Sequence, residues 1–230
     1  MQGAEHIMQY IVICTLGRSG STLLQGILNA FEGCCVRGEN NNFLLGIYEA
    51  YRSLKIANKI GSNALLPTHP WYGGNHLNPD KFLRDFVKIF NEQLAIPDGT
   101  RIAGFKEIRW LPSHLRKYSL TEYIYFLHDL LKNVKFVLLT RNSEDVYNSQ
   151  IRAGFDLSGQ DLQYFSMMAG NFYREMRSID LPIFELDYSD IVNNSYKIPE
   201  MFDFLELRYD AEIVKSVLEF EHSYANSSRR

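Results

Sequence analysis

Apolar positions along the 230-residue chain follow two patterns. Short, nearly continuous apolar runs rich in β-branched residues predict buried strands, and these runs lie at 10–14, 34–36, 101–106, 134–140 and 182–188. Apolar residues spaced three or four positions apart predict amphipathic helices, which we place at 22–30, 43–60, 79–96, 119–132, 151–180, 197–207 and 211–220. Strands that alternate with helices predict an α/β fold of three layers (αβα), in which a mostly parallel sheet lies between two layers of helices.

We expect residues 1–230 to form a single domain, because this length suits one hydrophobic core. Residues 1–9 are expected to be flexible, and the Ser/Arg-rich tail at 221–230 is expected to fray. The segment 61–79 carries three prolines and three glycines and predicts a long loop. Loops of this length inside a domain are usually functional, so we interpret 61–79 as an active-site loop.

Composition and charge exclude several classes of protein. A hydrophobic content of 46% and a charged content of 22% are ordinary for a globular chain, and a formal charge of −3 gives no overall attraction to nucleic acid. No apolar run approaches the roughly 18 residues that span a bilayer. Three cysteines, Cys14, Cys34 and Cys35, cannot all pair. We therefore expect a cytoplasmic protein with no nucleic-acid partner, no membrane partner and no metal cluster.

The strand at 10–14 leads into Gly17-Arg18-Ser19-Gly20-Ser21-Thr22, and a helix follows. A strand, a tight glycine turn and a helix point backbone N–H groups and a positive helix end at an anion, which predicts a phosphate-binding loop. The loop is not a Walker A motif, because no lysine follows at the required place, and Ser19 breaks the dinucleotide pattern GxGxxG. A glycine-rich turn without a ligand is the structural alternative.

A second junction of this kind follows the strand at 134–140, the most continuous apolar run of the chain. Arg141 comes directly after that strand, and Ser149 lies eight residues further on. Asn142 or Ser143 can cap the next helix, which places Ser149 about two turns along it. As an alternative, Arg141 forms a surface ion pair with Glu144 or Asp145.

Charged side chains mark two further strand ends, where ligands of open α/β sheets bind. Glu39 follows the strand at 34–36, and Lys106 ends the strand at 101–106. For Glu39, a role as cap or first-turn carboxylate of the next helix is as good an interpretation as a catalytic role. A strand-end lysine is most often a solvated side chain, so the sequence pattern alone gives Lys106 no function.

The predicted loop at 61–79 contains His69, Trp71, Tyr72 and His76. Aromatic faces stack on sugar or aryl rings, so these residues are candidates for the wall of an acceptor site. The alternative is a flap whose aromatic residues only anchor it to the core.

Together, the two junctions resemble the motifs of sulfotransferases that use 3′-phosphoadenosine 5′-phosphosulfate (PAPS), most closely the trehalose-type carbohydrate and tyrosylprotein branches. The resemblance implies that the loop 17–22 binds the 5′-phosphosulfate. Its residues are Gly17, Arg18, Ser19, Gly20, Ser21 and Thr22. The resemblance also implies that Arg141 and Ser149 bind the 3′-phosphate. The segment from Tyr188 is similar to the family's Tyr-Glu-Asp-Leu stretch, with Ser189 in place of Glu, so Tyr188 is either a nucleotide contact or a packing aromatic.

The resemblance implies transfer of a sulfuryl group, in line and without metal, to a hydroxyl of a small-molecule, carbohydrate or phenolic acceptor, with adenosine 3′,5′-bisphosphate (PAP) as product. Glu39 would be the general base, and Arg18 and Lys106 would stabilise developing charge. Ile108 stands where the steroid and phenol branch has its catalytic histidine, which favours Glu39. A magnesium-dependent kinase with a degenerate phosphate loop and a non-catalytic nucleotide-binding protein are the alternatives.

Overall fold

The computed structural model describes residues 8–157 and 159–219. The predictions for 1–9 and 221–230 therefore fall outside the described residues, apart from Met8 and from Gln9, which begins a strand. Within this range, five strands form one parallel sheet in the order β2-β3-β1-β4-β5. The strands are β1 Gln9–Cys14, β2 Cys34–Arg37, β3 Ile102–Glu107, β4 Val134–Thr140 and β5 Ile183–Asp187. The predicted α/β class with a parallel central sheet is confirmed.

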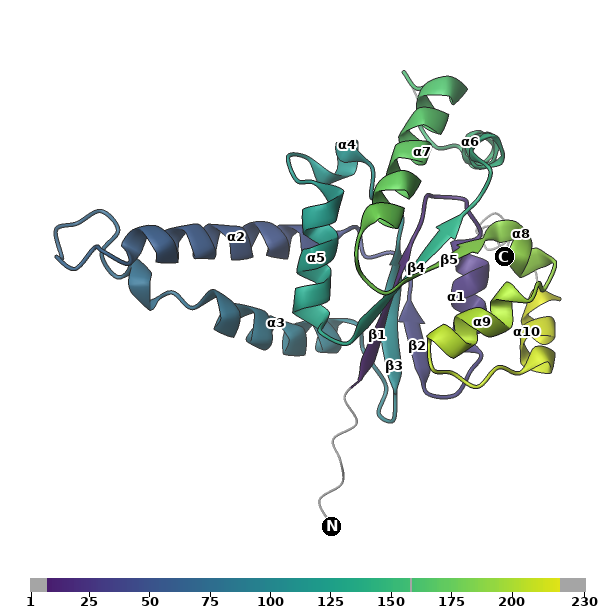
Figure 1. The fold of residues 1–230 in the computed structure, drawn as a ribbon, viewed down its shortest axis with the longest axis horizontal. Coiled ribbons are helices and arrows are strands. Elements are labelled where there is room, and N and C mark those ends of the chain that lie inside the picture. Colours follow the sequence, from purple (N-terminus) through teal and green to yellow (C-terminus); the bar gives the residue numbers. More distant parts are fainter. Residues whose placement is uncertain (1–7, 158, 220–230) are drawn as a thin grey trace, which may run out of the picture.

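Helices connect the strands and cover both faces of the sheet (Figure 1). The longer ones are α1 Ser21–Asn29, α2 Phe43–Gly61, α3 Pro79–Gln93, α5 Leu120–Leu131, α6 Ser143–Arg152, α7 Leu162–Ser178, α9 Lys197–Phe204 and α10 Ala211–Leu218. Three short elements were not predicted from the sequence: the 3₁₀ turn η1 Gly74–His76, α4 Pro112–Leu115 and α8 Tyr188–Val192.

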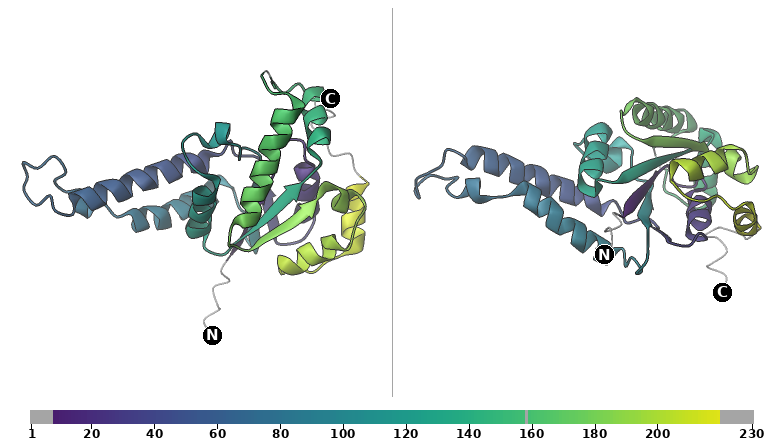
Figure 2. Two further views of the ribbon diagram at one scale, coloured as in Figure 1. Left: turned by 45° about the horizontal axis from the view of Figure 1, so that its top comes forward. Right: turned by 60° about the horizontal axis from the view of Figure 1, so that its bottom comes forward.

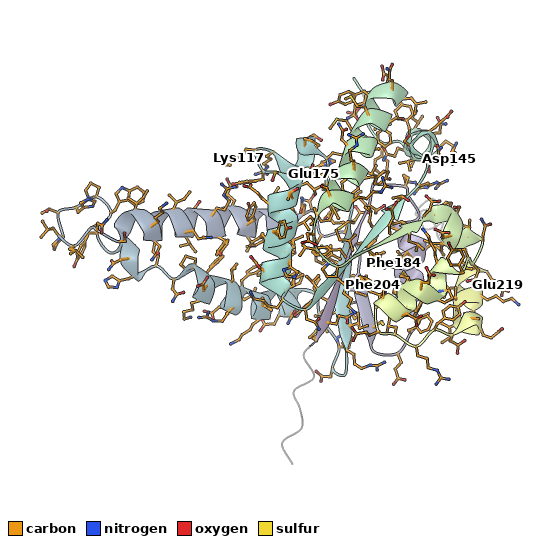
Figure 3. All side chains as sticks on the ribbon, in the orientation of Figure 1. Lys117, Asp145, Glu175, Phe184, Phe204 and Glu219 are labelled. Atoms are coloured by element: carbon orange, nitrogen blue, oxygen red, sulfur yellow. The ribbon has the colours of Figure 1, made fainter. Side chains whose placement is uncertain are left out.

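The side chains of β1 divide the core into two clusters, because successive strand residues point to opposite faces. Tyr10, Val12 and Cys14 pack with α3, α5, α7 and the first turns of α2, whereas Ile11 and Ile13 pack with α1, α9 and α10. Figure 2 shows the two helical layers from other directions. On the second face Phe184 of β5 lies against Phe204 of α9, with ring centres 5.5 Å apart (Figure 3).

One predicted helix begins later than expected. The sequence predicts a helix with an irregular start over 151–180, but α6 ends at Arg152 and α7 begins only at Leu162. Gly154 and Gly159 in between have φ values of 76° and 79°, in the left-handed region that glycine tolerates best. These two residues separate α6 from α7.

Helices α2 and α3 form an arm that extends away from the sheet (Figures 1 and 2). The inner part of the arm is anchored in the core, where Leu44, Tyr48, Phe86 and Phe90 are buried. The connecting segment 62–78 lies at the far end of the arm. The arm therefore carries this segment away from the carboxyl edge of the sheet.

Candidate active site

The phosphate loop lies between β1 and α1, at the carboxyl edge of the sheet. Arg18 and Gly20 have φ values of 69° and 97°, and Gly20 is the N-cap residue of α1. A Cβ atom at Gly20 would lie 2.3 Å from the Tyr188 ring, so a larger residue does not fit here. Leu23 donates the first backbone bond back to Gly20, which leaves the earlier amides of Ser21 and Thr22 at the positive end of the helix.

Hydrogen bonds from three polar side chains hold this loop in place. Thr15 Oγ1 donates to the Leu139 carbonyl at 2.7 Å and lies 2.5 Å from Ser19 Oγ. Because Thr15 has only one hydroxyl hydrogen, Ser19 is the donor between the two. Gln150 Nε2 donates to the Gly17 carbonyl at 2.9 Å. The hydroxyl of Ser19 is fully buried and shapes the loop, so any contact of Ser19 with a phosphate involves its other atoms.

The two junctions predicted from the sequence meet at one place. Arg18 Nε donates to Ser149 Oγ at 3.3 Å, and Arg141 Nη1 donates to the Arg18 carbonyl at 3.1 Å. The Arg141 guanidinium carbon lies 4.2 Å from the centre of the Tyr188 ring, which is a cation–π contact. Side-chain contacts thus direct Arg141 to the phosphate loop, whereas the alternative pairing was with Glu144 or Asp145. The N-cap of α6 is Asn142, one of the two residues predicted for this position.

A charged cluster lies at the ends of β2 and β3. Lys106 Nζ donates to Glu39 Oε1 at 2.8 Å, and Arg109 Nη1 lies 3.3 Å from Glu39 Oε2. Lys106 is buried, whereas a third of the Glu39 side chain is exposed. Glu39 does not cap α2, because the N-cap residue of that helix is Asn42. The carboxylate of Glu39 is therefore accessible and is paired with cations, and the capping alternative does not hold.

Sequence reasoning missed Glu107, which organises this cluster. Its carboxylate is fully buried and accepts from the backbone N–H groups of Asn42, Ile108 and Arg109 at 2.8, 2.8 and 3.1 Å. Arg109 Nη1 also donates to it at 2.9 Å. One signal was available: a carboxylate directly after Lys106 at the end of an otherwise apolar strand has to find donors when it is buried.

Three buried polar atoms at the site have no hydrogen-bond partner: the side-chain O and N of Asn40 and Nε of Arg141. Asn40 follows Glu39, and Arg141 lies beside the phosphate loop. Buried polar groups are normally paired, so these atoms fit a bound polar ligand. An unpaired guanidinium N–H on a side chain that already contacts the phosphate loop at Arg18 fits a phosphate oxygen. Within 8–157 and 159–219, no three His, Cys, Asp or Glu side chains are placed to hold a metal ion.

The structure does not bring the predicted acceptor-wall residues to this site. His69, Trp71, Tyr72 and His76 all lie in the segment at the end of the arm. The 19 residues of α2 extend for about 28 Å at 1.5 Å per residue, and the helix starts three residues after Asn40. The interpretation of 61–79 as an active-site loop is therefore not supported within one chain.

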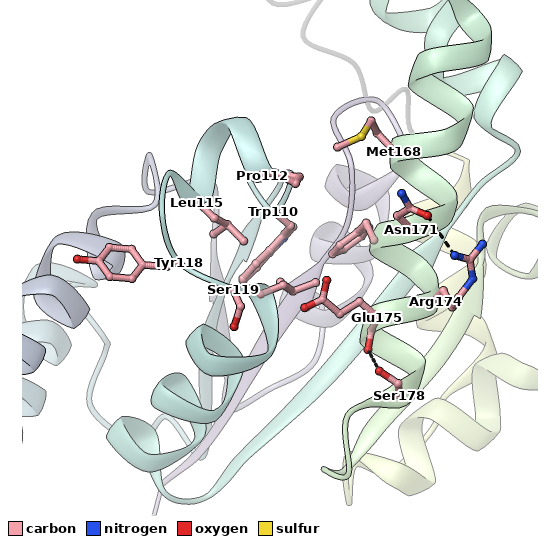
Figure 4. Close-up of a pocket in the computed structure, with 12 residues that line it drawn as sticks. Trp110, Pro112, Leu115, Tyr118, Ser119, Met168, Asn171, Arg174, Glu175 and Ser178 are labelled. Carbon is pink, nitrogen blue, oxygen red and sulfur yellow. Dashed lines mark hydrogen bonds between the residues drawn. The ribbon is translucent and has the colours of Figure 1, made fainter.

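A cavity of about 550 Å³ lies between the α4–α5 region and α7 (Figure 4). Trp110, Leu115 and Phe172 provide apolar walls, and Asn171 and Glu175 lie among the polar residues that line it. Trp110 Nε1 donates to the Glu107 carbonyl at 2.6 Å. The cavity thus borders the charged cluster through Trp110, but no residue of the phosphate loop lines it.

A sequence model of the sulfotransferase family matches residues 10–211. The match covers most of the chain, both junctions and the charged cluster, so this protein belongs to the sulfotransferase family. No curated protein matches the sequence. Among the described residues, no helix combines the length and the apolar character that a membrane crossing requires.

Several solved sulfotransferase structures share the fold. The sulfotransferase domain of the Synechococcus PCC 7002 olefin synthase has a TM-score of 0.59 at 15% identity, with 100% of this chain and 86% of that chain covered. The domain from the curacin biosynthetic pathway has a TM-score of 0.53 at 16% identity, with 94% and 79% covered. Mouse sulfotransferase SULT7A1, solved in complex with PAP, has a TM-score of 0.50 at 13% identity, with 99% and 68% covered.

Proposed function

We propose that this protein transfers a sulfuryl group from PAPS to a hydroxyl of a small-molecule, carbohydrate or phenolic acceptor, without a metal ion. The observation that carries the proposal is the meeting of Arg18, Ser149 and Arg141 at the phosphate loop, where one Arg141 donor is buried and unpaired. Mouse SULT7A1, which has the same fold, was solved with PAP, in agreement with a donor of this kind. The free cysteines are consistent with a reducing, cytoplasmic setting.

The donor is held by two groups of residues. The amides of Ser21 and Thr22 and the Arg18 side chain bind the 5′ end, and Arg141 and Ser149 bind the 3′-phosphate. Tyr188 lies against Gly20 and under the Arg141 guanidinium, so its ring fixes both parts of the site. PAPS supplies the sulfuryl group, and the residues of this chain orient it.

The acceptor side is formed by the charged cluster and an apolar surface. Glu39 takes the proton of the acceptor hydroxyl, because its carboxylate is accessible. Lys106 has three N–H donors and gives one to Glu39, so it also stabilises negative charge that develops during transfer. A Cβ added at Gly17 would lie 3.2 Å from Ile108 and 3.4 Å from the exposed ring of Phe155. These two side chains give an acceptor an apolar face beside the phosphate loop.

A thermal-shift experiment tests the donor class. PAP without magnesium is expected to raise the Tm by roughly 5–10 °C at a hundredfold excess over its Kd, and excess chelator is expected to leave this shift and the transferase activity unchanged. Stabilisation by ATP and magnesium but not by PAP would indicate a kinase. No stabilisation by either nucleotide would contradict both the sulfotransferase and the kinase assignment.

Arg141→Ala is expected to weaken PAP binding roughly 10- to 150-fold, as for the loss of a charge-assisted hydrogen bond. AMP lacks the 3′-phosphate, and its affinity is expected to change little. Isothermal titration calorimetry with both nucleotides measures the difference. Arg152→Ala is the matched control, because it removes an exposed arginine from the far end of α6, the helix that follows Arg141. Equal losses for PAP and AMP in Arg141→Ala would contradict recognition of the 3′-phosphate by this residue.

A further inference from the structure

The segment 62–78 at the end of the α2–α3 arm, here called the arm tip, exposes large apolar side chains. Leu65, Leu66, Tyr72 and Trp71 are 74%, 69%, 55% and 43% exposed. Figures 1 and 2 show that no other part of the described chain lies over this end of the arm. Large apolar side chains that gather on an exposed surface mark a site of interaction with a protein or a membrane.

The arm tip is folded, although its side chains point outward. Asn58 of α2 donates to the Leu77 carbonyl at 2.7 Å. Gly61 and Gly74 pack so closely that a Cβ on Gly61 would lie 2.5 Å from the Gly74 Cα atom. Backbone bonds from His69 to Leu66 and from Tyr72 to His69 form successive turns. The fold of the tip thus presents its apolar residues in a defined arrangement.

Charge divides the outer arm into two zones. From Ile60 to Pro79 the chain contains no Asp, Glu, Lys or Arg. The flanking residues 50–59 and 80–85 contain five basic and two acidic residues, a net charge of +3 in a chain of formal charge −3. The basic residues are Arg52, Lys55, Lys59, Lys81 and Arg84. Arg52 pairs with Glu122 of α5 and Lys81 with Asp85, so the basic collar depends on Lys55, Lys59 and Arg84. An uncharged apolar end with a basic collar is complementary to an anionic lipid surface, where Trp and Tyr favour the interface.

We propose that the arm tip inserts into the surface of an anionic lipid bilayer. A lipid surface accepts a few apolar side chains without a shaped protein partner. A stable contact with a second protein buries about 800 Å² on each side, which is a large area for the end of a two-helix arm. The absence of an 18-residue apolar run led us to expect no membrane partner, but surface insertion does not require a spanning segment.

The two tryptophans make the proposal measurable. Trp71 is in the arm tip, whereas Trp110 is buried in the core with 1% exposure, so a change in tryptophan fluorescence on binding reports on Trp71. Vesicles of phosphatidylcholine with about a third phosphatidylserine are expected to sediment the full-length protein and to shift its emission to the blue. Vesicles of phosphatidylcholine alone are expected to bind much less. Trp71→Phe should remove the spectral shift.

Variants locate the contact. The double variant Leu65→Asp, Leu66→Asp is expected to bind anionic vesicles at least about a hundredfold more weakly, because two leucines leave the apolar phase. Lys55→Ala and Lys59→Ala are expected to weaken binding about fivefold each. Tyr196→Asp is the control, because Tyr196 is 72% exposed at the start of α9, away from the arm (Figure 1), and this variant should bind as the unchanged protein does. All of these positions are exposed, and their Tm values should remain close to that of the unchanged protein.

Two results would overturn the proposal. One is a leucine variant that binds anionic vesicles as well as the unchanged protein. The other is a blue shift of Trp71 that grows with protein concentration in the absence of lipid, which would assign the arm tip to a contact with a second copy of this chain. Neither result bears on PAP binding, so the proposed donor is tested separately.

Discussion

Glu39→Gln is expected to lower kcat by roughly 10²–10⁴-fold and to leave the Kd for PAP nearly unchanged. The substitution removes the proton acceptor, while the amide oxygen still accepts a hydrogen bond from Lys106. A loss in kcat without a loss in donor affinity identifies an interaction made in the transition state. The measurement needs an acceptor, which incubation with radiolabelled PAPS and a panel of sugars, phenols and peptides identifies.

Glu49→Gln is the matched control for this prediction. Glu49 pairs with Lys117 at 3.2 Å and with Arg116 at 4.0 Å, so it is also a carboxylate between two cations. It lies on α2 outside the charged cluster, and its substitution is expected to leave kcat unchanged. A folded Glu39→Gln variant with near-normal turnover would show that Glu39 is not the base. Glu39 would then be a structural ion pair with Lys106 and Arg109.

Local patterns predicted most of the fold. The apolar run at 134–140 became β4 with the expected bounds, and Asn142 caps the helix after it. Such signals depend on neighbours in the sequence, so they can be recognised without the structure. The start of α7 was predicted only in part, because Gly154 and Gly159 indicated an irregular start over 151–180 but not that the helix begins only at Leu162. Both glycines adopt left-handed conformations, and they lie in the non-helical segment between the end of α6 and the start of α7.

The candidate site was predictable only in part. Arg18, Lys106 and Arg141 follow or end parallel strands, and parallel strands place their carboxyl ends at one edge. The role of Glu107 could not be predicted, because its donors include the backbone of Asn42, 65 residues away in sequence. The position of 61–79 depends on the direction in which α2 leaves the sheet. A loop can be recognised from its prolines and glycines, but the sequence does not show where a long helix carries it.

The positions of Glu39 and Glu107 separate two roles within one cluster. Arg109 Nη1 lies within 3.3 Å of Glu39 and 2.9 Å of Glu107, so one guanidinium links the accessible carboxylate to the buried one. Glu107 also fixes the backbone at Asn42, where α2 begins. Glu39 is therefore expected to act in turnover, and Glu107 to hold the end of β3 against the start of the arm.

Glu107→Ala is expected to lower the free energy of unfolding by about 3 kcal/mol. It would leave the Arg109 guanidinium and three backbone N–H groups without their acceptor. The value is at the lower end of the range for breaking a buried ion pair, because 30% of the Arg109 side chain is exposed. Urea denaturation measures it, and Glu107→Gln is expected to lose less, since one carboxamide oxygen still accepts.

Glu122→Ala is the control for burial, because Glu122 pairs with Arg52 at 3.1 Å and 57% of its side chain is exposed. Exposed pairs contribute about 0–1 kcal/mol, so this variant should unfold close to the unchanged protein. Folded Glu107→Gln should bind PAP normally and keep more of its kcat than Glu39→Gln. If Glu107→Ala unfolds at the same urea concentration as the unchanged protein, Glu107 does not stabilise the junction of β3 and α2. A loss of kcat in Glu107→Gln equal to that in Glu39→Gln would mean that the two carboxylates act in catalysis as one unit.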